Sequence, residues 1–299
     1  MEDGIIQQIM KSGKREGAYY ETVPTTIPPE TRRLFEEYVG TAADDVIPYL
    51  AEFRDRLWDV YPWPCVGQFK FVSLTLYRQP SYGRICDIVR RGGRFLDIGC
   101  AAGQDLRYLM LDAAAGQTDG AGNPLTPSAL SANSFGLDRM AGYIETAYDF
   151  FRDRDRLQTR FIVADLFDRR ADGPVEPLLR GSVDVLHAGM IVHVWDLPGQ
   201  HRACERIVEL LAPRPGVIAV GNNVARLEGK AGDYIGPEGT IMYKHDAASF
   251  RAMWAEVGVR TGTRWEVRTH NDPVVGLNGE TAHWIDPDTS RLYWEVERL

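Results

Sequence analysis

The chain has 299 residues, of which 44% are hydrophobic, and this is enough to bury one elaborated core or two small ones. Its formal net charge of −8 argues against phosphate-backbone binding as the main task, because there is no surplus of basic residues to release counterions. No apolar run reaches the roughly 18 residues of a membrane span, and the first residues show no signal-peptide pattern, so we expect a cytoplasmic protein that contacts neither nucleic acid nor membrane.

The four cysteines are scattered along the chain without the C-x-x-C spacing of a metal or redox site. They are Cys65, Cys86, Cys100 and Cys204. We expect reduced thiols rather than a disulfide framework. The histidines likewise show no ligand spacing with a nearby acid, so no metal site is expected.

Residues 1–90 contain no strand–helix–strand pattern. Helices are predicted over 29–39, where two prolines stand at the start, and over 43–61. An aromatic and proline cluster follows: Trp58, Tyr61, Pro62, Trp63, Pro64, Phe69 and Phe71. We predict a helical cap over 1–90 on a domain that spans 91–299, with the cluster either packing the cap onto that domain or surrounding an apolar acceptor. The cap helices are also the candidate interface for a homodimer.

Apolar strands alternate with helical stretches from residue 93 to about residue 222, and this alternation predicts a parallel sheet with helices on both faces. The predicted strands are 94–98, 134–138, 160–164, 183–188 and 216–221. Residues 112–133 are rich in Ala, Gly, Asn, Pro, Ser and Thr, and this composition predicts a long surface loop.

The pattern changes in the last part of the chain. The elements predicted there are a helix over about 246–257 and strands near 263–269, 281–285 and 291–297. The last two strands flank Asp286-Pro287-Asp288, a turn that favours an antiparallel hairpin at the sheet edge. The expected fold class is therefore α/β, with a mostly parallel sheet and an antiparallel edge.

The first predicted strand leads into the most informative segment, Asp97-Ile98-Gly99-Cys100-Ala101-Ala102-Gly103-Gln104. The glycines permit a sharp turn, and the small residues between them let a ligand lie against the main chain. A dinucleotide fold would require G-x-G-x-x-G, but Ala101 stands at its middle glycine. An acid beneath a small-residue loop suits the ammonium end of S-adenosylmethionine. The predicted cofactor-binding residues here are Asp97, Gly99, Cys100, Gly103 and Gln104, and the alternative is an ordinary strand-to-helix turn.

The ends of the next two strands carry further candidates for cofactor binding, because ligands of such sheets bind beyond the carboxyl ends of the strands. Asp138, followed by Arg139, ends the second strand, where a carboxylate would accept both ribose hydroxyls. Asp165 follows the third strand, where it would accept from the adenine amino group while Leu166 packs on the ring. Each acid alone is more often a helix cap or loop residue, but acids at three successive strand ends favour a methyltransferase.

The fourth strand ends in His187 and Ala188, which are predicted to lie under the sulfonium. His193 lies just past this strand, facing the region where the transferred methyl should sit. We predict that His193 contacts the acceptor, either as a general base for a hydroxyl or as a hydrogen-bond donor that orients a carboxylate. The alternative is a structural histidine at the start of the helix that leads through Trp195 and Asp196.

Several segments form a combination that is specific to one group of proteins: ETRRLFEEY at 30–38, DIGC at 97–100, GQDLR at 103–107, YDFFRDRD at 148–155, VHVWD at 192–196 and HDAASF at 245–250. Together they resemble fungal methyltransferases of secondary metabolism, notably of meroterpenoid pathways, over about residues 19–270. The resemblance implies a class I methyltransferase fold with a seven-stranded sheet, S-adenosylmethionine as methyl donor and a small-molecule acceptor. The group includes enzymes that methylate a carboxyl group to an ester. The chain departs from it at 112–133 and at Gly189-Met190-Ile191, and both departures bear on the acceptor pocket.

We therefore expect an S-adenosylmethionine-dependent O-methyltransferase of a small secondary metabolite, with methylation of a carboxyl group as the first interpretation. A carboxylate is already ionised at neutral pH and needs no general base, whereas a phenol or alcohol, the alternative acceptor, benefits from one. Two further alternatives are an NAD(P)-dependent oxidoreductase, which Ala101 disfavours, and a methyltransferase-like binding protein that has lost activity.

Overall fold

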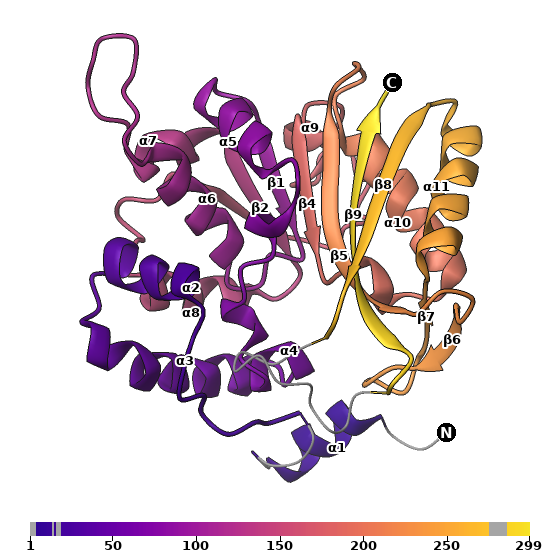
Figure 1. Ribbon diagram of the computed structural model, residues 1–299, viewed down its shortest axis with the longest axis horizontal. Helices are drawn as coiled ribbons and strands as arrows, with labels where there is room; N and C mark the ends of the chain where they lie inside the picture. The colour runs from indigo at the N-terminus through magenta and orange to yellow at the C-terminus, as the bar shows by residue number, and fades with distance from the viewer. Residues whose placement is uncertain (1–3, 14, 16–18, 275–285) are drawn as a thin grey trace.

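The computed structural model describes residues 4–13, 15, 19–274 and 286–299. A seven-stranded sheet runs through its centre in the order β3-β2-β1-β4-β5-β9-β8 (Figure 1). The strands are β1 (Phe95–Ile98), β2 (Ser134–Asp138), β3 (Arg160–Val163), β4 (Val185–Gly189), β5 (Ile218–Arg226), β8 (Trp265–Asp272) and β9 (Thr289–Arg298). Only β9 runs antiparallel to its neighbours in this sheet, so the predicted α/β fold with an antiparallel edge is confirmed.

Helices cover both faces of the sheet, as predicted. They are α5 (Tyr82–Arg90), α6 (Gln104–Ala114), α8 (Ala141–Phe151), α9 (Glu176–Leu179), α10 (Leu197–Leu210) and α11 (Ala247–Thr261). Neighbouring residues of β4 show the two layers, because successive side chains of a strand point to opposite faces. Val185 packs in the core cluster of α5 and α6, and Leu186 packs in the cluster of α10 and α11.

The two helices on the second face begin where the sequence supplies caps. The carboxylate of Asp196 accepts a hydrogen bond from the backbone N–H of Gly199 at 2.8 Å, so α10 begins at Leu197. Asp246 and Ser249 form a reciprocal capping box at the start of α11, and Gly262 ends that helix in the left-handed conformation. The predicted helix over 246–257 is therefore confirmed and extends to Thr261.

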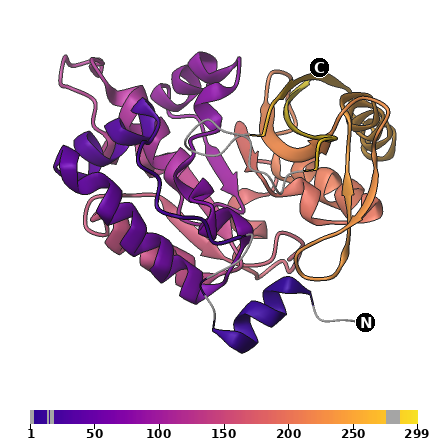
Figure 2. The same ribbon diagram turned by 60° about the horizontal axis from the view of Figure 1, so that its bottom comes forward.

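The N-terminal part is helical, as predicted, and packs beside α6 and α8 (Figure 2). Its elements are α1 (Ile5–Ser12), α2 (Pro29–Arg33), η1 (Leu34–Val39), η2 (Ala43–Asp45), α3 (Val46–Val60), α4 (Pro64–Gly67), η3 (Lys70–Val72) and η4 (Leu76–Arg78). Phe35 and Phe53 contact Phe150 of α8 with ring centroids 5.0 and 4.4 Å away. The boundary at residue 90 stays a prediction, and α5, which ends there, packs directly on the sheet.

Three segments differ from the sequence prediction or go beyond it. A two-stranded hairpin of β6 (Gly232–Ile235) and β7 (Ile241–Lys244) was not predicted. The antiparallel edge pair is formed by β8 and β9, while the predicted strand 281–285 lies outside the described residues. The predicted loop 112–133 is exposed over 115–124, and its ends belong to α6 and to α7 (Pro127–Leu130) with η5 (Ser131–Asn133). Within the described residues no helix is both long enough and apolar enough to cross a membrane.

Candidate functional site

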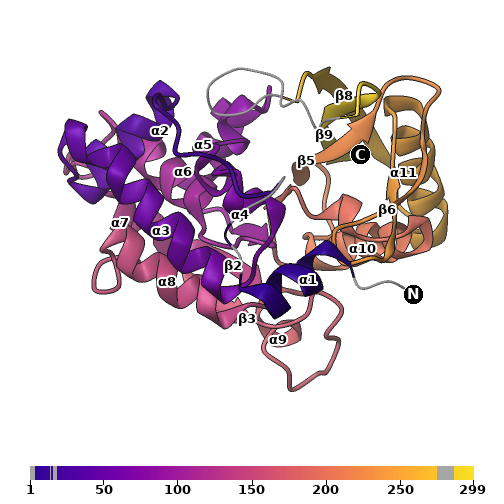
Figure 3. The ribbon, with the colours of Figure 1, turned by 90° about the horizontal axis from the view of Figure 1, so that it is seen from below.

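A cavity of about 780 Å³ opens at the carboxyl ends of β1, β2 and β4. In an open parallel sheet this edge is where ligands bind, because the loops that follow the strands converge there. Figure 3 views the molecule from this edge, where α1, α4 and β6 lie. The cavity is lined by the turn after β1, by the residues that follow β2, β3 and β4, and by parts of the N-terminal helices and the β6–β7 hairpin.

Asp97 of β1 and His187 of β4 form a buried pair at this edge. The two residues are register partners on neighbouring strands, and Oδ1 of Asp97 lies 2.8 Å from Nδ1 of His187. Burial lowers the pKa of His187, but the charge of Asp97, its hydrogen bond and the charge of Asp105 outweigh burial and raise the pKa above its ordinary value. Among the described residues, Nε2 of His187 has no hydrogen-bond partner.

The turn after β1 needs its glycines for two different reasons. Gly99 and Gly103 have φ of +64° and +63°, and Ala101 between them has φ of +46°. Gly99 lines the cavity, and a Cβ there would lie 3.0 Å from the side chain of Ile191. A Cβ at Gly103 would instead lie 2.9 Å from Arg107, on the side of the turn away from the cavity. Gly103 therefore shapes the turn and the start of α6 rather than the cavity wall.

Asp138 ties the turn to the end of β2. Its carboxylate accepts hydrogen bonds from the backbone N–H groups of Ala101 and Met140, each at 2.8 Å. Burial raises the pKa of Asp138, and these two hydrogen bonds only partly offset that effect. An ionised carboxylate has about four acceptor positions, so both oxygens keep capacity for a ligand.

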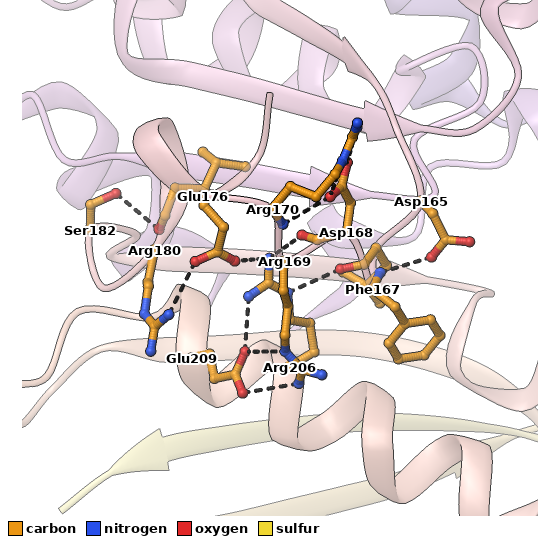
Figure 4. Close-up of polar contacts among 12 residues, drawn as sticks. Asp165, Phe167, Asp168, Arg169, Arg170, Glu176, Arg180, Ser182, Arg206 and Glu209 are labelled. Atoms are coloured by element: carbon orange, nitrogen blue, oxygen red, sulfur yellow. Dashed lines mark hydrogen bonds and ion pairs between the residues drawn. The ribbon is translucent and has the colours of Figure 1, made fainter. Parts of the chain in front are cut away.

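The loop after β3 presents Asp165 and Leu166 to the cavity. Figure 4 shows Asp165 beside Phe167 in this loop. Asp165 is exposed, and its Oδ1 accepts from the backbone N–H of Phe167 at 2.8 Å. Leu166 is buried, and its carbonyl accepts from Nε of Arg206 at 3.0 Å. Arg206 in turn pairs with Glu209 at 2.8 Å, so the loop is held on α10 by a buried guanidinium.

The structure brings most of the predicted cofactor-binding residues to one cavity. Those that line it are Asp97, Gly99, Cys100, Gln104, Asp138, Arg139, Asp165, Leu166 and His187. Gly103 and Ala188 are not among the lining residues. Ala188 follows His187 on β4, so its side chain points to the opposite face of the sheet, into the core under α10.

His193 lines the same cavity from η6 (Val192–Val194), the short helical turn between β4 and α10. Burial, together with the charges of Arg291, Lys244 and Lys70, lowers the pKa of His193 to about 3, so its imidazole is neutral at physiological pH. Nδ1 of His193 has no hydrogen-bond partner within the part of the chain that the structure describes. The residue that caps α10 is Asp196, so His193 is not needed to begin that helix.

Three cations were missed by the sequence analysis. Lys70 of η3, Lys244 at the end of β7 and Arg291 of β9 all line the cavity. Burial and the charge of Arg291 lower the pKa of Lys70 to about 8, so this amine stays mostly protonated near neutrality. These residues come from remote segments, and each is the single basic residue in its local sequence. Only the folded chain brings them together, with Arg291 placed by the insertion of β9 beside β5.

The N-terminal aromatic cluster is divided between the core and the cavity. Trp63 and Phe71 line the cavity, whereas Trp58 and Phe69 are buried in the core of the helical part. Tyr19 also lines the cavity, and β6 and β7 add Tyr234, Ile235, Ile241 and Met242. The wall on this side is therefore mainly apolar and aromatic.

All four cysteines of the chain lie in the part that the structure describes. All four cysteines are free. No group of histidine, cysteine, aspartate and glutamate side chains that would hold a metal ion occurs in the described ranges.

The chain is similar to several known proteins. Residues 19–72 match the model of the meroterpenoid methyltransferase N-terminal domain. The O-methyltransferase atr3 of Stereocaulon alpinum is 33% identical over 298 residues, which cover 98% of this chain and 80% of the relative. The O-methyltransferase phiE of a fungal species is 35% identical over 85% of this chain and 79% of the relative. Among solved structures, the 1,6-didemethyltoxoflavin-N1-methyltransferase of Burkholderia thailandensis is 14% identical, with a TM-score of 0.46 over 93% of each chain.

Proposed function

This chain belongs to the family of fungal meroterpenoid-pathway methyltransferases, for which S-adenosylmethionine is the methyl donor, and we propose that it methylates a carboxylate of a small apolar acid to give a methyl ester. The methyl donor and the O-methyltransferase class follow from the family. The carboxyl acceptor is the part that we propose, and the observation that supports it is the separation of negative and positive side chains along the cavity.

The β1–β3 end of the cavity fits the donor. Asp97 suits an ammonium group, Asp138 suits paired ribose hydroxyls, and Asp165 suits an adenine amino group, because ionised carboxylates are strong acceptors. Nε2 of His187 and Oε1 of Gln104 are buried without partners in the described structure, and a bound ligand would satisfy them. When bound, S-adenosylmethionine supplies an electrophilic methyl group on a positively charged sulfur.

The other end of the cavity carries the opposite charge. The order of the strands separates the two ends, because Asp97, Asp138 and Asp165 follow β1, β2 and β3 while β9 lies beyond β4 and β5. Lys70, Lys244 and Arg291 supply the positive charges there. Acids offset this positive charge only in part: Asp286 pairs with Arg226 at 2.7 Å and also attracts Lys244, and Glu21 attracts Lys70. A cationic subsite beside a methyl donor favours an anionic acceptor.

The low basicity of His193 favours the same kind of acceptor, a carboxylate. With a pKa near 3, its imidazole is a weak base and would contribute little to removing a proton from an alcohol or a phenol. A carboxylate needs no such help. The neutral ring can donate one hydrogen bond, and in this proposal His193 orients the acceptor rather than deprotonating it.

The apolar wall completes the reaction site. Trp63 and Phe71 would pack on the body of the acceptor and exclude water from the reacting oxygen. Alignment of the nucleophile and exclusion of water are the main contributions a protein makes to a displacement at a methyl group.

The test is the chemical stability of the product. The enzyme is incubated with methyl-labelled S-adenosylmethionine and two apolar acids with unhindered carboxyl groups (2-naphthoic and farnesoic acid), each beside its primary alcohol. Mild alkali releases labelled methanol from an ester but leaves an ether intact. We expect alkali-labile label with acids and none with alcohols. Alkali-stable label on a hydroxyl compound would establish the alternative acceptor, and donor binding with no transfer to any compound would point to an inactive binding protein.

A further inference from the structure

Arg291 occupies an unusual position for an arginine. It lies near the start of β9, the next-to-last strand of the sheet, opposite Val224 of β5 and Asp272 of β8. Its side chain lines the cavity and is only 8% exposed. A guanidinium cannot give up its proton in a protein, so its burial is costly unless a partner compensates the charge.

Other deeply buried arginines of this chain have such a partner. Arg107 is fully buried and pairs with Asp153 at 2.6 Å. Arg206 is also fully buried and pairs with Glu209 at 2.8 Å. Arg291, by contrast, has no ion pair with any residue that the structure describes. Burial lowers its pKa and the charge of Arg78 adds to this effect, while a hydrogen bond to the side chain of Tyr293 and the charge of Asp272 offset it only in part.

The surroundings of Arg291 make its lack of a partner more costly. The positive charges of Arg78 and Lys70 lie close to Arg291, and both repel its guanidinium. Asp272 attracts it, although the two side chains make no ion pair. Because a guanidinium carries five N–H donors in a planar fork, the missing partner that best fits this place is a carboxylate bound through both of its oxygens.

We propose that Arg291 anchors the carboxylate of the acceptor and thereby selects carboxylic acids over their alcohols and amides. This inference rests on the proposed carboxyl methylation and assigns its specificity to one side chain. The acceptor class is a carboxylic acid with an apolar body, because Val224, Val274 and Met242 line the same cavity as Arg291.

The first experiment needs no ligand. Replacing a buried charge that has no ion-pair partner by an apolar side chain of similar length should stabilise the free protein, because the cost of burying the charge disappears. We expect Arg291→Met to raise the melting temperature by about 2 °C or more. Arg298→Met makes the same chemical change on the same strand outside the cavity and should not raise it. A lower melting temperature for Arg291→Met would show that the guanidinium has a stabilising partner, and this would overturn the proposal.

The second experiment measures specificity in the same variants. With an acid that the wild type esterifies, Arg291→Met should raise KM for the acid on the order of 100-fold, because one partner of a buried charge pair is lost. Arg291→Lys should recover only part of this loss, since an ammonium lacks the fork. Calorimetry should give the same Kd for S-adenosylmethionine in all variants, and Arg298→Met should have the wild-type KM.

The outcomes separate this inference from the function on which it rests. Ester formation with unchanged KM in Arg291→Met would refute the anchor and leave carboxyl methylation intact. Carboxyl methylation, and the anchor with it, would be refuted if the wild type formed ethers. The same conclusion would follow if the wild type bound none of the acids more tightly than the corresponding alcohol. A Kd for S-adenosylmethionine that rises as much as KM for the acid would place Arg291 in the cofactor half of the cavity and also refute the anchor.

Discussion

The buried pair of Asp97 and His187 makes the stability of the protein depend on pH in a defined direction. Asp97 raises the pKa of His187 above its ordinary value of 6.5. The stability contributed by the pair is therefore fully present below that ordinary value and is lost as the pH rises through the folded-state pKa. In Asp97→Asn the charge is gone, burial dominates, and the pKa of His187 should fall. The free energy of unfolding of Asp97→Asn should therefore fall furthest below that of the wild type at acidic pH.

The magnitude follows from the burial of both groups. Asp97 is 4% exposed and His187 is 2% exposed, and removing one partner of such a pair costs about 3 kcal/mol. Urea unfolding near pH 5.5 and near pH 8, on either side of the ordinary histidine pKa, measures the difference between wild type and Asp97→Asn. We expect the larger difference at the lower pH. Asp165→Asn, the same change at an exposed strand end, serves as the control. An equal loss at both pH values would mean that His187 is neutral throughout and would refute the reasoning.

Three further predictions concern the ligands. Asp138→Ala should weaken S-adenosylmethionine binding about tenfold or more, since a hydrogen bond to a charged group contributes about 1.5–3 kcal/mol, and unchanged affinity by calorimetry would contradict the ribose assignment. Gly99→Val should abolish this binding, because φ is +64° at Gly99 and the added carbons would meet Ile191, while circular dichroism still reports a folded protein. Normal binding by this variant would show that the turn does not hold the cofactor. His193→Ala should lower turnover modestly without changing S-adenosylmethionine affinity or the pH profile near neutrality, because its pKa lies near 3. A loss of about a hundredfold, with an acidic limb that disappears in the variant, would instead identify a general base.

The fold and the cofactor half of the cavity could be predicted because their signals are local. Alternation of apolar strands and helices predicts the parallel sheet, and an acid at a strand end is visible within a few residues, as with Asp97 and Asp138. Side-chain direction was harder to predict. Gly103 belongs to the same turn as Gly99, but a Cβ at Gly103 would face Arg107. The side chain of Ala188 points away from the cavity, because Ala188 follows His187 by one residue on a strand.

The cationic half could not be predicted in the same way, because it is assembled from remote segments. Lys70 follows the N-terminal helices, Lys244 ends a short strand, and Arg291 lies on the strand that enters the sheet last. In sequence, a lone cation in a strand resembles the exposed position of an edge strand. The β6–β7 hairpin had a signal that was overlooked, since Gly236-Pro237-Glu238-Gly239 is a turn between two runs of β-forming residues.

The charge arrangement of the cavity also limits how strongly the acceptor should be held. A carboxylate and a sulfonium have opposite charges and give a neutral ester and a neutral thioether, so charge is lost as the reaction proceeds. A dry cavity favours such a step, but only if binding repays the desolvation of the carboxylate beforehand. Arg291 can supply that interaction. The same contact withdraws electron density from the nucleophile and weakens as the charge disappears, so it stabilises the bound acid more than the transition state. Weakening the contact through Arg291→Lys should therefore raise KM for the acid and leave kcat unchanged or slightly higher. A fall in kcat with constant KM would mean that Arg291 acts on the transition state, and steady-state kinetics with a single acid distinguishes the two.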